Sequence, residues 1–437
     1  MAKINVLLIG SGGREHALGW AIAKSPSLQK LWACPGNPGL AGLAELLPRD
    51  YLDDIAKPER LIEFIATNAI GLVVIGPEAP LVAGLVDVLQ DKGIACFGPS
   101  KAAAQLEGSK AFARDFASRH HIPQPAWQRF SDSDSARAYI DYIDSIASSS
   151  GKYVIKADGL AAGKGVVIAE DKSQAHATIT AMLDEGAYGT ASQTIVIEEY
   201  LDGTEASLFA LCDGAMAIRF GSAQDYKRLK DGDQGPNTGG MGAISPAPAL
   251  TPEIENLAWQ EIIAPTLAGM ARDGNPYHGF LYAGLMINQN RPKLIEFNCR
   301  FGDPEAQAIF PRLKTDLLAA LLAASHGQLT PAHVGFTDAT SVSVVMANRG
   351  YPQAIADNKA PIHGLETVVV DKGNCLVFHN GTTQKNDTII ASGGRVLTIT
   401  GMGDKRETAR SIAYDRVAKI GWGENNGGCF YRRDIGS

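Results

Sequence analysis

The amino-acid sequence predicts an α/β protein that starts with a doubly wound parallel sheet and continues into further domains. A length of 437 residues, at about 150 residues per domain, corresponds to about three domains. In the first hundred residues, β-rich apolar runs alternate with helical segments, which is the pattern of a parallel sheet covered by helices. In the last hundred, several short strands accompany one helix, so we expect a small, mainly β C-terminal domain.

A repeated strand, turn and helix pattern predicts the N-terminal domain, which we place at residues 1–122. Its first apolar run ends in the Gly-rich turn 10–13 and is followed by a helix. Ser109 is a suitable N-cap for a connector helix that ends before the extended dipeptide Ile122-Pro123. The expected elements are strands at 4–9, 31–34, 72–75 and 94–97, and helices at 17–23, 81–90 and 109–120.

The central part is predicted to have a small lobe at 123–192 and a large lobe at 193–329, followed by the C-terminal domain at 330–437. In each lobe, two neighbouring strands should pair as an antiparallel hairpin, and that of the small lobe encloses a Gly-rich turn. The expected elements are a polar helical region at 131–148, strands at 152–156, 165–168, 194–197, 205–211, 280–288 and 293–298, a helix at 317–324, strands at 341–346, 366–370 and 396–400, and a helix at 407–420.

Composition and charge exclude several classes of function. With 40 Lys and Arg against 47 Asp and Glu, the net charge of -7 supplies no field to hold a polyphosphate backbone, so we expect no nucleic-acid partner. The longest apolar runs have only strand length and the first strand leads straight into a Gly-rich turn, so we expect neither a membrane span nor a signal peptide. Six cysteines without a CxxC pair are typical of a reducing compartment, and we expect a cytoplasmic protein.

The first Gly-rich turn predicts a phosphate site at the start of a helix. Glu15 occupies the third glycine position of a G-x-G-x-x-G motif and no acid follows the second strand, so a dinucleotide site is disfavoured. The backbone N–H groups at the helix N-terminus, with Arg14 beside them, would bind one phosphate. The alternative is an ordinary turn between a strand and a helix.

The second Gly-rich segment, 158–165, lies between the two hairpin strands of the small lobe. It is not a Walker A motif, because Asp158 stands at the first glycine position and Gly165 replaces the Ser or Thr that binds magnesium. A Gly-rich flap at this place would close over a triphosphate, and Lys156 on the preceding strand would face the phosphates. The alternative is a hairpin turn with an exposed lysine.

Two further segments carry charged residues without a defining motif. The acids that follow the strand at 194–197 would accept hydrogen bonds from an adenine amino group or a ribose, and a solvated acidic turn is the alternative. The segment 224–242 combines charges with many glycines, which is typical of a loop that covers a substrate. A disordered surface loop is the alternative there.

The strand that ends at Asn298 predicts a metal site. Residues two apart on a strand face the same side, so Glu296 and Asn298 should point together while Ile295 and Phe297 pack on the opposite side. Two hard oxygen ligands on one face suit magnesium that bridges ATP phosphates. Arg300 would continue this face and hold a carboxylate or a phosphate. An alternation on the protein surface is the other interpretation.

In this order, the segments resemble the glycinamide ribonucleotide synthetase family, the phosphoribosylamine–glycine ligases of the ATP-grasp superfamily. The resemblance covers nearly the whole chain and implies an ATP-grasp fold for the two central lobes. The segments that carry it are Gly10-Ser11-Gly12-Gly13-Arg14-Glu15-His16, Gly76-Pro77-Glu78-Ala79-Pro80-Leu81, Gly108-Ser109-Lys110, Lys156-Ala157-Asp158-Gly159-Leu160-Ala161-Ala162-Gly163-Lys164-Gly165, Gly235-Pro236-Asn237-Thr238-Gly239-Gly240-Met241-Gly242 and Asn298-Cys299-Arg300-Phe301-Gly302-Asp303-Pro304-Glu305.

The resemblance implies a set of residues for each part of the site. For ATP it implies Lys110, Lys156, Gly163, Lys164 and Gly165 at the phosphates, Glu198, Glu199, Tyr200 and Leu201 at the adenine, and Glu205 at the ribose. For magnesium or manganese it implies Glu296 and Asn298. For 5-phosphoribosylamine and further substrate contacts it implies Gly12, Gly13, Arg14, Glu15, Asn37, Glu78, Asn237, Gly239 and Gly240, and near glycine and the reacting phosphate the catalytic residues Asp225, Lys227 and Arg300.

The implied reaction converts ATP, glycine and 5-phosphoribosylamine into ADP, phosphate and glycinamide ribonucleotide through glycyl phosphate, in de novo purine biosynthesis. We expect a monomer or a weak homodimer. Two departures from the family pattern are Tyr226, where His is expected, and Asn348-Arg349, where small residues are expected. Neither removes a group assigned to chemistry. The alternatives are another ATP-grasp carboxylate–amine ligase or a carboxylase and, from a different class, a Rossmann oxidoreductase.

Overall fold

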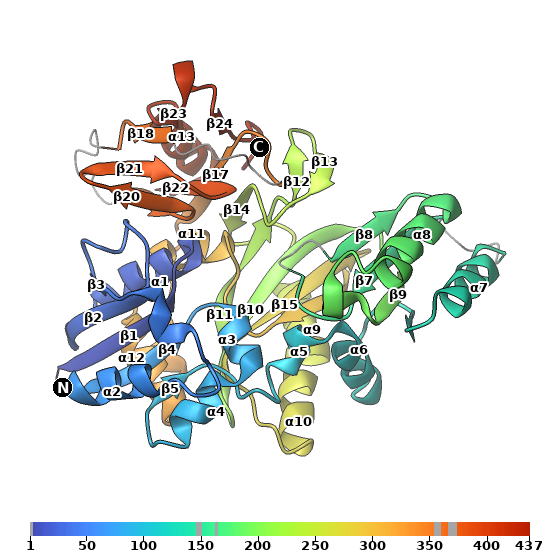
Figure 1. The fold of residues 1–437 in the computed structure, drawn as a ribbon, viewed down its shortest axis with the longest axis horizontal. Helices are drawn as coiled ribbons and strands as arrows, with labels where there is room; N and C mark the ends of the chain where they lie inside the picture. Colours follow the sequence, from blue (N-terminus) through green and yellow to red (C-terminus); the bar gives the residue numbers. More distant parts are fainter. Residues whose placement is uncertain (1–2, 146–150, 162–164, 354–359, 366–373) are drawn as a thin grey trace.

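The computed structural model describes residues 3–145, 151–161, 165–353, 360–365 and 374–437. A parallel-sheet unit contains the N-terminus, a small lobe projects to the right, and a C-terminal unit lies above the central sheet (Figure 1). The predicted site residues Gly163 and Lys164 and the strand expected at 366–370 lie outside the described residues.

The N-terminal unit is built on a five-stranded parallel sheet. Its strands are β1 Ile4–Gly10, β2 Leu28–Pro35, β3 Glu45–Leu46, β4 Ile70–Ile75 and β5 Cys96–Phe97, in the order β3-β2-β1-β4-β5. In β1, Val6 and Leu8 pack into one hydrophobic cluster while Leu7 and Ile9 pack into another, so both faces of the sheet are buried. A parallel sheet covered on both faces is the predicted doubly wound arrangement, which is confirmed.

The helices of this unit include the three expected ones, one of them interrupted, and two that were not expected, at 59–67 and 105–108. They are α1 Gly13–Ala23, α2 Glu59–Thr67, α3 Glu78–Ala83, α4 Leu85–Gln90, α5 Gln105–Gly108 and α6 Lys110–Arg119. The single helix expected at 81–90 is divided because Gly84 has a φ of 95°, in the left-handed region that ends a helix. Ser109 caps α6 as predicted, since its Oγ accepts a hydrogen bond from Phe112 N at 3.0 Å.

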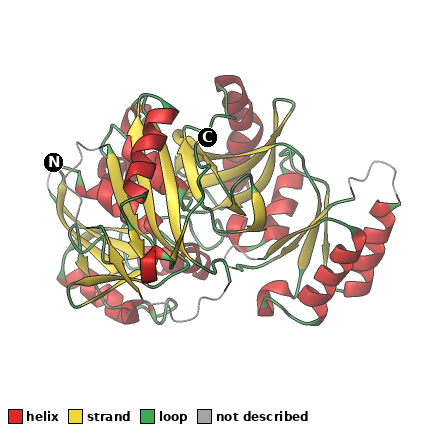
Figure 2. Cartoon of the chain, turned by 90° about the horizontal axis from the view of Figure 1, so that it is seen from above, coloured by secondary structure: helices red, strands yellow, loops and turns green. Residues whose placement is uncertain are grey.

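The small lobe is a four-stranded sheet with its two longest helices on one face (Figure 2). The elements are β6 Trp127–Phe130, α7 Ser133–Asp144, β7 Tyr153–Ala157, β8 Val166–Ala169, α8 Lys172–Ile179 and β9 Ile195–Glu199, with the strand order β6-β9-β7-β8. The antiparallel β7–β8 hairpin is confirmed. Tyr153 and Ile155 face the helices in the lobe's own core. Strand alternation therefore places Lys156 on the opposite face, toward the large lobe.

One nine-stranded sheet joins the large lobe to the C-terminal unit. Its strands are β10 Thr204–Asp213, β11 Ala217–Asp225, β14 Gly242–Ser245, β15 His278–Asn288, β16 Arg291–Asn298, β17 Thr340–Asn348, β19 Cys375–His379, β22 Arg395–Gly403 and β24 Cys429–Phe430. The order is β16-β15-β10-β11-β14-β17-β22-β19, and β24 pairs with β17. Strands on the two sides of the predicted boundary near residue 330 thus belong to one continuous sheet, because the unexpected strand β14 pairs with β17.

The predicted β15–β16 hairpin is confirmed, but its register differs from a plain alternation. Gly284 pairs with Glu296 whereas Leu285 pairs with Leu294, so Ile295 is an extra, bulged residue. Leu294 and Phe297 belong to the core, and Ile295 does not. The expectation that Ile295 and Phe297 share a buried face is therefore wrong, because the bulge shifts the alternation by one residue.

The remaining elements are distributed over all parts of the fold. They are β12 Arg228–Lys230, β13 Gln234–Asn237, α9 Pro252–Ala258, α10 Ala264–Arg272, α11 Glu305–Ile309, α12 Leu317–Ser325, β18 Ala360–His363, β20 Thr382–Lys385, β21 Thr388–Ala391, α13 Arg406–Val417 and β23 Gly421–Trp422, with short 3-10 or π segments at Arg49–Leu52, Thr180–Asp184, Gly189–Ser192, Trp259–Ile263, Phe310–Arg312, Pro331–His333 and Glu424–Asn426. Among the helices in the described ranges, none combines the length and the apolar character needed to cross a bilayer.

Candidate active site

A cluster of carboxylates and lysines lies on the central sheet, where β16 approaches the first turn of α6. Lys110 Nζ is 3.4 Å from Glu296 Oε2, and Lys227 Nζ is 2.6 Å from Glu205 Oε2. Asp225, at the end of β11, interacts electrostatically with Lys227 and with the carboxylates of Glu205 and Glu296. The fold therefore brings together five predicted site residues that are distant in the sequence.

Burial and charge determine the protonation of this cluster. Burial raises the pKa of Asp225 to about 7, although Lys227 favours its ionised form. Burial also opposes ionisation of Glu296, but Lys110 and Lys227 outweigh it and hold the pKa of Glu296 below its usual range. Asn298 is buried two positions further along the same strand face. Carboxylate and amide oxygens in an acidic, enclosed place are the donors that a divalent cation prefers, so these residues fit the predicted metal.

A second buried group lies between the small lobe and α6. Lys156 Nζ is 2.8 Å from Glu198 Oε2, and Arg114 Nε is 2.7 Å from Glu198 Oε1. Lys156 also donates to the bulged Ile295 carbonyl at 3.2 Å, and Arg114 donates to the same oxygen. Burial lowers the pKa of Lys156 to about 8, although Glu198 opposes this shift. The Glu198 carboxylate is thus engaged by two cations, and its contact with adenine stays a prediction.

The segment after β9 connects the small lobe to β10. Glu199 Oε2 is 3.7 Å from Lys293 Nζ, which lies on the large lobe. Lys152 Nζ lies 5.2 Å from the ring centre of Tyr200, and Leu201 is half-buried. These residues therefore lie where the two lobes meet, and their contacts with adenine stay predictions.

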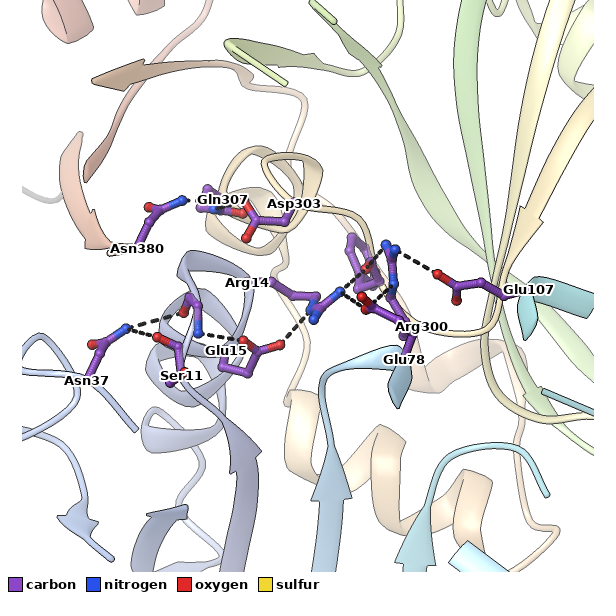
Figure 3. Close-up of polar contacts among 12 residues, drawn as sticks. Ser11, Arg14, Glu15, Asn37, Glu78, Glu107, Arg300, Asp303, Gln307 and Asn380 are labelled. Atoms are coloured by element: carbon purple, nitrogen blue, oxygen red, sulfur yellow. Dashed lines mark hydrogen bonds and ion pairs between the residues drawn. The ribbon is translucent and has the colours of Figure 1, made fainter. Parts of the chain in front are cut away.

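A chain of alternating charges connects the N-terminal unit to the end of β16 (Figure 3). Arg300 Nε is 3.2 Å from Glu78 Oε2, and Arg300 Nη2 is 2.8 Å from Glu107 Oε1. Arg14 Nη1 is 3.6 Å from the same Glu78 oxygen, and Arg14 Nε is 2.5 Å from Glu15 Oε1. Burial opposes ionisation of Glu78, but Arg300 and Arg14 outweigh it and lower its pKa to about 2. Four predicted residues meet here.

The Gly-rich turn before α1 is occupied by a side chain of the protein itself. Gly12 N–H donates to Glu15 Oε2 at 2.7 Å, so this carboxylate caps the helix. A Cβ on Gly10 or Gly76 would lie 2.4 Å from Glu15 atoms, so both glycines make room for that side chain. The phosphate contact predicted at this turn stays a prediction.

Residues of three units surround the start of α1. Asn37 Nδ2 donates to the carbonyls of Ser11 and His379, at 2.9 Å in each case. A Cβ on Gly13 would lie 2.4 Å from Gln307 Nε2, so Gly13 permits the close approach of α11. Asn37 and Gly13 therefore connect the N-terminal unit to its neighbours, and their contacts with a substrate stay predictions.

The loop at 237–240 reaches the turn that follows β16. Asn237 pairs with Arg228 across β12 and β13. Gly240 N–H donates to Thr238 Oγ1 at 3.0 Å, and a Cβ on Gly240 would lie 2.6 Å from Pro304 Cδ. The predicted residues of this loop thus lie beside the segment that carries Arg300, as a loop that covers a substrate would require.

The two departures from the family pattern have structural explanations. Tyr226 Oη accepts a hydrogen bond from Gly436 N at 3.2 Å, and the Arg432 guanidinium lies 5.1 Å from the Tyr226 ring. Asn348 is buried, and its Oδ1 accepts from Trp422 Nε1 at 2.6 Å. Both side chains therefore help to pack the C-terminal unit.

Several residues of the site were missed in the sequence. Arg114 had one usable signal, because it follows Lys110 by four residues and therefore lies on the same helix face. Glu107 and Arg395 lie outside the motifs, and Tyr351 belongs to the Gly350-Tyr351-Pro352 run without a role assigned to it. Their roles depend on partners far away in the chain, such as Cys299, whose N–H donates to Glu107 Oε2 at 2.8 Å.

Comparison with known families supports this arrangement. Three domains described for phosphoribosylglycinamide synthetase match in order: the N domain at 4–107, the ATP-grasp (A) domain at 108–306 and the C domain at 341–437. The chain belongs to the phosphoribosylglycinamide synthetase family. This membership confirms the predicted family, the ATP-grasp fold and the ligase class.

Named relatives match this chain over nearly their whole length. The chain is 49% identical over 433 residues to "Phosphoribosylamine--glycine ligase" of Mesorhizobium japonicum, covering 99% of this chain and 98% of the relative. It is 50% identical to the protein of the same name from Agrobacterium fabrum, with the same coverage. These identities place the chain well inside the phosphoribosylglycinamide synthetase family.

Solved structures show the same architecture. A crystal structure of phosphoribosylamine–glycine ligase from Thermotoga maritima has a TM-score of 0.83 at 33% identity and covers 99% of this chain and 100% of that one. The biotin carboxylase domain of the Hydrogenobacter thermophilus 2-oxoglutarate carboxylase, solved with MgADP and bicarbonate, has a TM-score of 0.72 at 14% identity, covering 99% and 92%. This second likeness shows a common fold.

Proposed function

We propose that the chain joins glycine to 5-phosphoribosylamine in an ATP-driven reaction of de novo purine biosynthesis, forming glycinamide ribonucleotide, ADP and phosphate. The observation that carries this function is the match of all three family domains along one chain, at 49% identity to a phosphoribosylamine–glycine ligase. Two groups of charges support it. The cluster that contains Lys110 and Glu296 suits a metal–nucleotide complex, and the chain of charges from Arg14 to Arg300 lies beside the first Gly-rich turn.

Glu296 and Asn298 would hold magnesium, or manganese in its place. Within the described ranges, no three His, Cys, Asp or Glu side chains form a metal site by themselves. Phosphate oxygens of ATP would therefore complete the coordination, as is usual for magnesium. When bound, the metal ion neutralises charge on the β- and γ-phosphates.

Lys110 and Lys156 would bind the ATP phosphates from two sides. Lys110 extends from α6 to Glu296 at 3.4 Å, and Lys156 extends from β7 to Ile295 O at 3.2 Å. Both ammonium groups thus reach neighbouring residues of β16. A polyphosphate placed over this part of the strand would receive compact positive charges from the connector helix and from the small lobe.

Glycine must be activated because a carboxylate is a poor acyl donor. Attack of its carboxylate on the γ-phosphate would form glycyl phosphate and give the carbonyl carbon a good leaving group. A covalent acyl-enzyme on the nearby thiol is disfavoured, because burial and Glu107 raise the pKa of Cys299 well above its usual value. Lys227 and Arg300, each held by carboxylates, would offset the negative charge that develops.

The amine substrate would bind between the Gly-rich turn and Arg300. Arg14 and Arg300 share the Glu78 carboxylate, so a phosphoribosyl group near Arg14 would have its amine close to the end of β16. The amine would then attack the carbonyl of glycyl phosphate and release phosphate. Asn237, Gly239 and Gly240 would cover the substrates from the other side.

A second candidate is another ATP-grasp carboxylate–amine ligase or a carboxylase. The fold shared with biotin carboxylase domains favours this alternative only at the nucleotide site. The family match removes the oxidoreductase alternative. The proposal includes a cytoplasmic monomer or weak homodimer, and the six cysteines, which include no CxxC pair, support a reducing compartment.

A coupled ADP-release assay tests the function. ADP should form only when glycine and freshly generated 5-phosphoribosylamine are both present, and glycinamide ribonucleotide should appear in equal amount. Replacing glycine by bicarbonate, or the amine by other amines, provides the controls. ADP release that depends on bicarbonate, or that is independent of the phosphoribosylamine, would contradict the proposal.

A further inference from the structure

An arginine of the C-terminal unit contacts two segments of the candidate site. Arg395, the first residue of β22, donates through Nη1 to Gly239 O at 2.5 Å and to Asp303 O at 2.6 Å. The same nitrogen lies 3.3 Å from Asp303 Oδ1. One guanidinium therefore connects the 237–240 loop to the turn that follows β16, although neither segment belongs to the C-terminal unit.

Tyr351 holds the same loop from a second direction. Its Oη accepts a hydrogen bond from Gly239 N–H at 2.9 Å. Both polar groups of the Gly239 residue are thus engaged by the C-terminal unit, its N–H by Tyr351 and its carbonyl by Arg395. Two opposed contacts on one residue fix both the position and the orientation of a loop, which a single contact would not do.

The packing around this pair leaves little freedom. A Cβ on Gly239 would lie 3.2 Å from Arg395 Cζ and 3.2 Å from Tyr351 Oη, so the loop backbone lies directly against both side chains. A Cβ on Gly394 would lie 2.5 Å from Tyr351 Cδ2, so a glycine beside Arg395 also allows the tyrosine ring to approach. The 237–240 loop is therefore tightly packed against Tyr351 and Arg395.

The second segment held by Arg395 continues into the charge chain of the site. Asp303 Oδ1 accepts from Gln307 Nε2 at 2.9 Å, and Asp303 lies close to Gln307 in Figure 3. The side chains of Arg395 and Asp303 are only 20% and 16% exposed, so their ion pair is partly shielded from water. Arg300 and Asp303 belong to one short turn, and restraint of Asp303 therefore restrains Arg300.

We propose that Arg395 and Tyr351 are positioning residues that hold the 237–240 loop and the 300–304 turn against each other around the site of glycine and 5-phosphoribosylamine. This inference rests on the proposed function, because it assigns both segments to those substrates. The nucleotide contacts would be independent of the pair. Glu198 binds Lys156 and Arg114, whereas Arg395 and Tyr351 contact Gly239 and the Asp303 turn.

The test compares Arg395→Met, Arg395→Lys and Tyr351→Phe with a matched control, Arg410→Met. Arg410 lies on α13 of the same unit and also donates to two backbone carbonyls, those of Ile435 at 3.1 Å and Arg433 at 2.6 Å. Its removal should cost a similar amount of stability without touching the 237–240 loop. Melting temperatures of all four variants provide the measure of folding.

Hydrogen exchange gives a readout that needs no reaction. In Arg395→Met, amides in 237–240 and 301–303 should exchange about tenfold faster or more, because charge-assisted hydrogen bonds are lost. In Tyr351→Phe, the Gly239 amide should exchange faster because its acceptor is removed. Arg410→Met should leave both segments at the wild-type rate. Wild-type exchange in both segments of Arg395→Met would overturn the inference.

Steady-state kinetics give the second readout. Arg395→Met should raise the KM for glycine or 5-phosphoribosylamine about tenfold or more and change the KM for ATP less than about twofold. Arg395→Lys should lie in between, because its ammonium keeps one charge-assisted contact. Equal rises for all three substrates, or none, would overturn the inference. A wild-type protein that forms no glycinamide ribonucleotide would instead overturn the proposed function, and the exchange rates would still decide on the positioning role.

Discussion

Lys156 Nζ lies 2.8 Å from Glu198 Oε2, and each side chain is only 3% exposed. The Arg114 guanidinium binds the same carboxylate through Nε and Nη2, at 2.7 and 2.8 Å. One buried carboxylate therefore balances two buried cations, and the group carries a net positive charge beside the space between the lobes. Burying such a charged group costs desolvation free energy, but a polyanion bound next to it would stabilise the group electrostatically.

Glu198→Gln should reduce the free energy of unfolding by about 3–5 kcal/mol, because it leaves two buried cations without their counter-charge. Glu199→Gln is the matched control, since Glu199 is the next residue and is exposed. Its effect should stay within about 0.5 kcal/mol. Urea unfolding followed by circular dichroism measures both. Similar stability of the two variants would show that the ion pairs of Glu198 with Lys156 and Arg114 do not stabilise the fold.

Much of the fold follows from local sequence patterns. The parallel strands near the N-terminus are apolar runs that end in glycine, and the β15–β16 hairpin carries Gln289-Asn290 at its turn, where φ is 48° and 62°. The continuous nine-stranded sheet was not predictable, because β14 has only four residues and its partner β17 lies about a hundred positions later. The bulge at Ile295 leaves no mark in the sequence.

Some residues of the site could likewise be predicted from local sequence patterns, and others could not. Glu296, Asn298 and Lys156 follow from strand alternation next to recognisable motifs. In the sequence Glu15 is a departure from the dinucleotide motif, whereas the structure shows it capping α1 through Gly12. That role depends on the glycines packed around its side chain, which local patterns do not reveal.

The contact between His16 and His379 should make stability depend on pH. His16 Nδ1 accepts from His379 N–H at 2.9 Å, and burial lowers the pKa of His16 to about 3 and that of His379 to about 4. In the unfolded chain both groups bind a proton near pH 6.5, so the unfolded state takes up more protons below that pH. As the pH drops below 6.5, stability should fall until about pH 4 for His379 and about pH 3 for His16, by about 1.4 kcal/mol from each histidine at pH 5.5.

Melting temperatures at pH 7.5 and 5.5 measure this effect. His16→Asn keeps an acceptor for the His379 N–H and removes one titrating group, so its melting temperature should change less between the two pH values than that of the wild type. His363→Asn, at an exposed position, is the control and should retain the wild-type difference. An unchanged pH difference in His16→Asn would refute the assignment.

Arg14→Lys should impair use of 5-phosphoribosylamine without affecting ATP. The guanidinium contacts Glu15, Glu78 and the Phe301 carbonyl at once, and a single ammonium group cannot reproduce that fork. We expect the KM for 5-phosphoribosylamine to rise about tenfold or more, with the KM for ATP nearly constant. Initial rates at varied concentrations of each substrate measure this. A selective rise in the KM for ATP would show that Arg14 acts in ATP binding and not in 5-phosphoribosylamine binding.

Glu296→Gln should weaken metal-dependent turnover far more than folding. The substitution keeps the shape of the side chain but removes the charge that faces Lys110 and would bind magnesium. The magnesium concentration for half-maximal rate should rise about tenfold or more, while the melting temperature changes little. Rates measured across a magnesium titration at saturating ATP decide the point. A wild-type response at limiting magnesium would contradict the metal assignment.

The path of oxygen distinguishes activation of glycine from the other possible chemistries. If the glycine carboxylate attacks the γ-phosphate, one of its oxygens becomes the bridge of glycyl phosphate and leaves with phosphate when the amine attacks the carbonyl. Glycine labelled with heavy oxygen in the carboxylate should therefore transfer one label to inorganic phosphate for each glycinamide ribonucleotide formed, as measured by mass spectrometry of the phosphate. ATP hydrolysis by water, or phosphorylation of the amine, would leave the phosphate unlabelled while product accumulates. That result would exclude the acyl phosphate and require another role for Lys227 and Arg300.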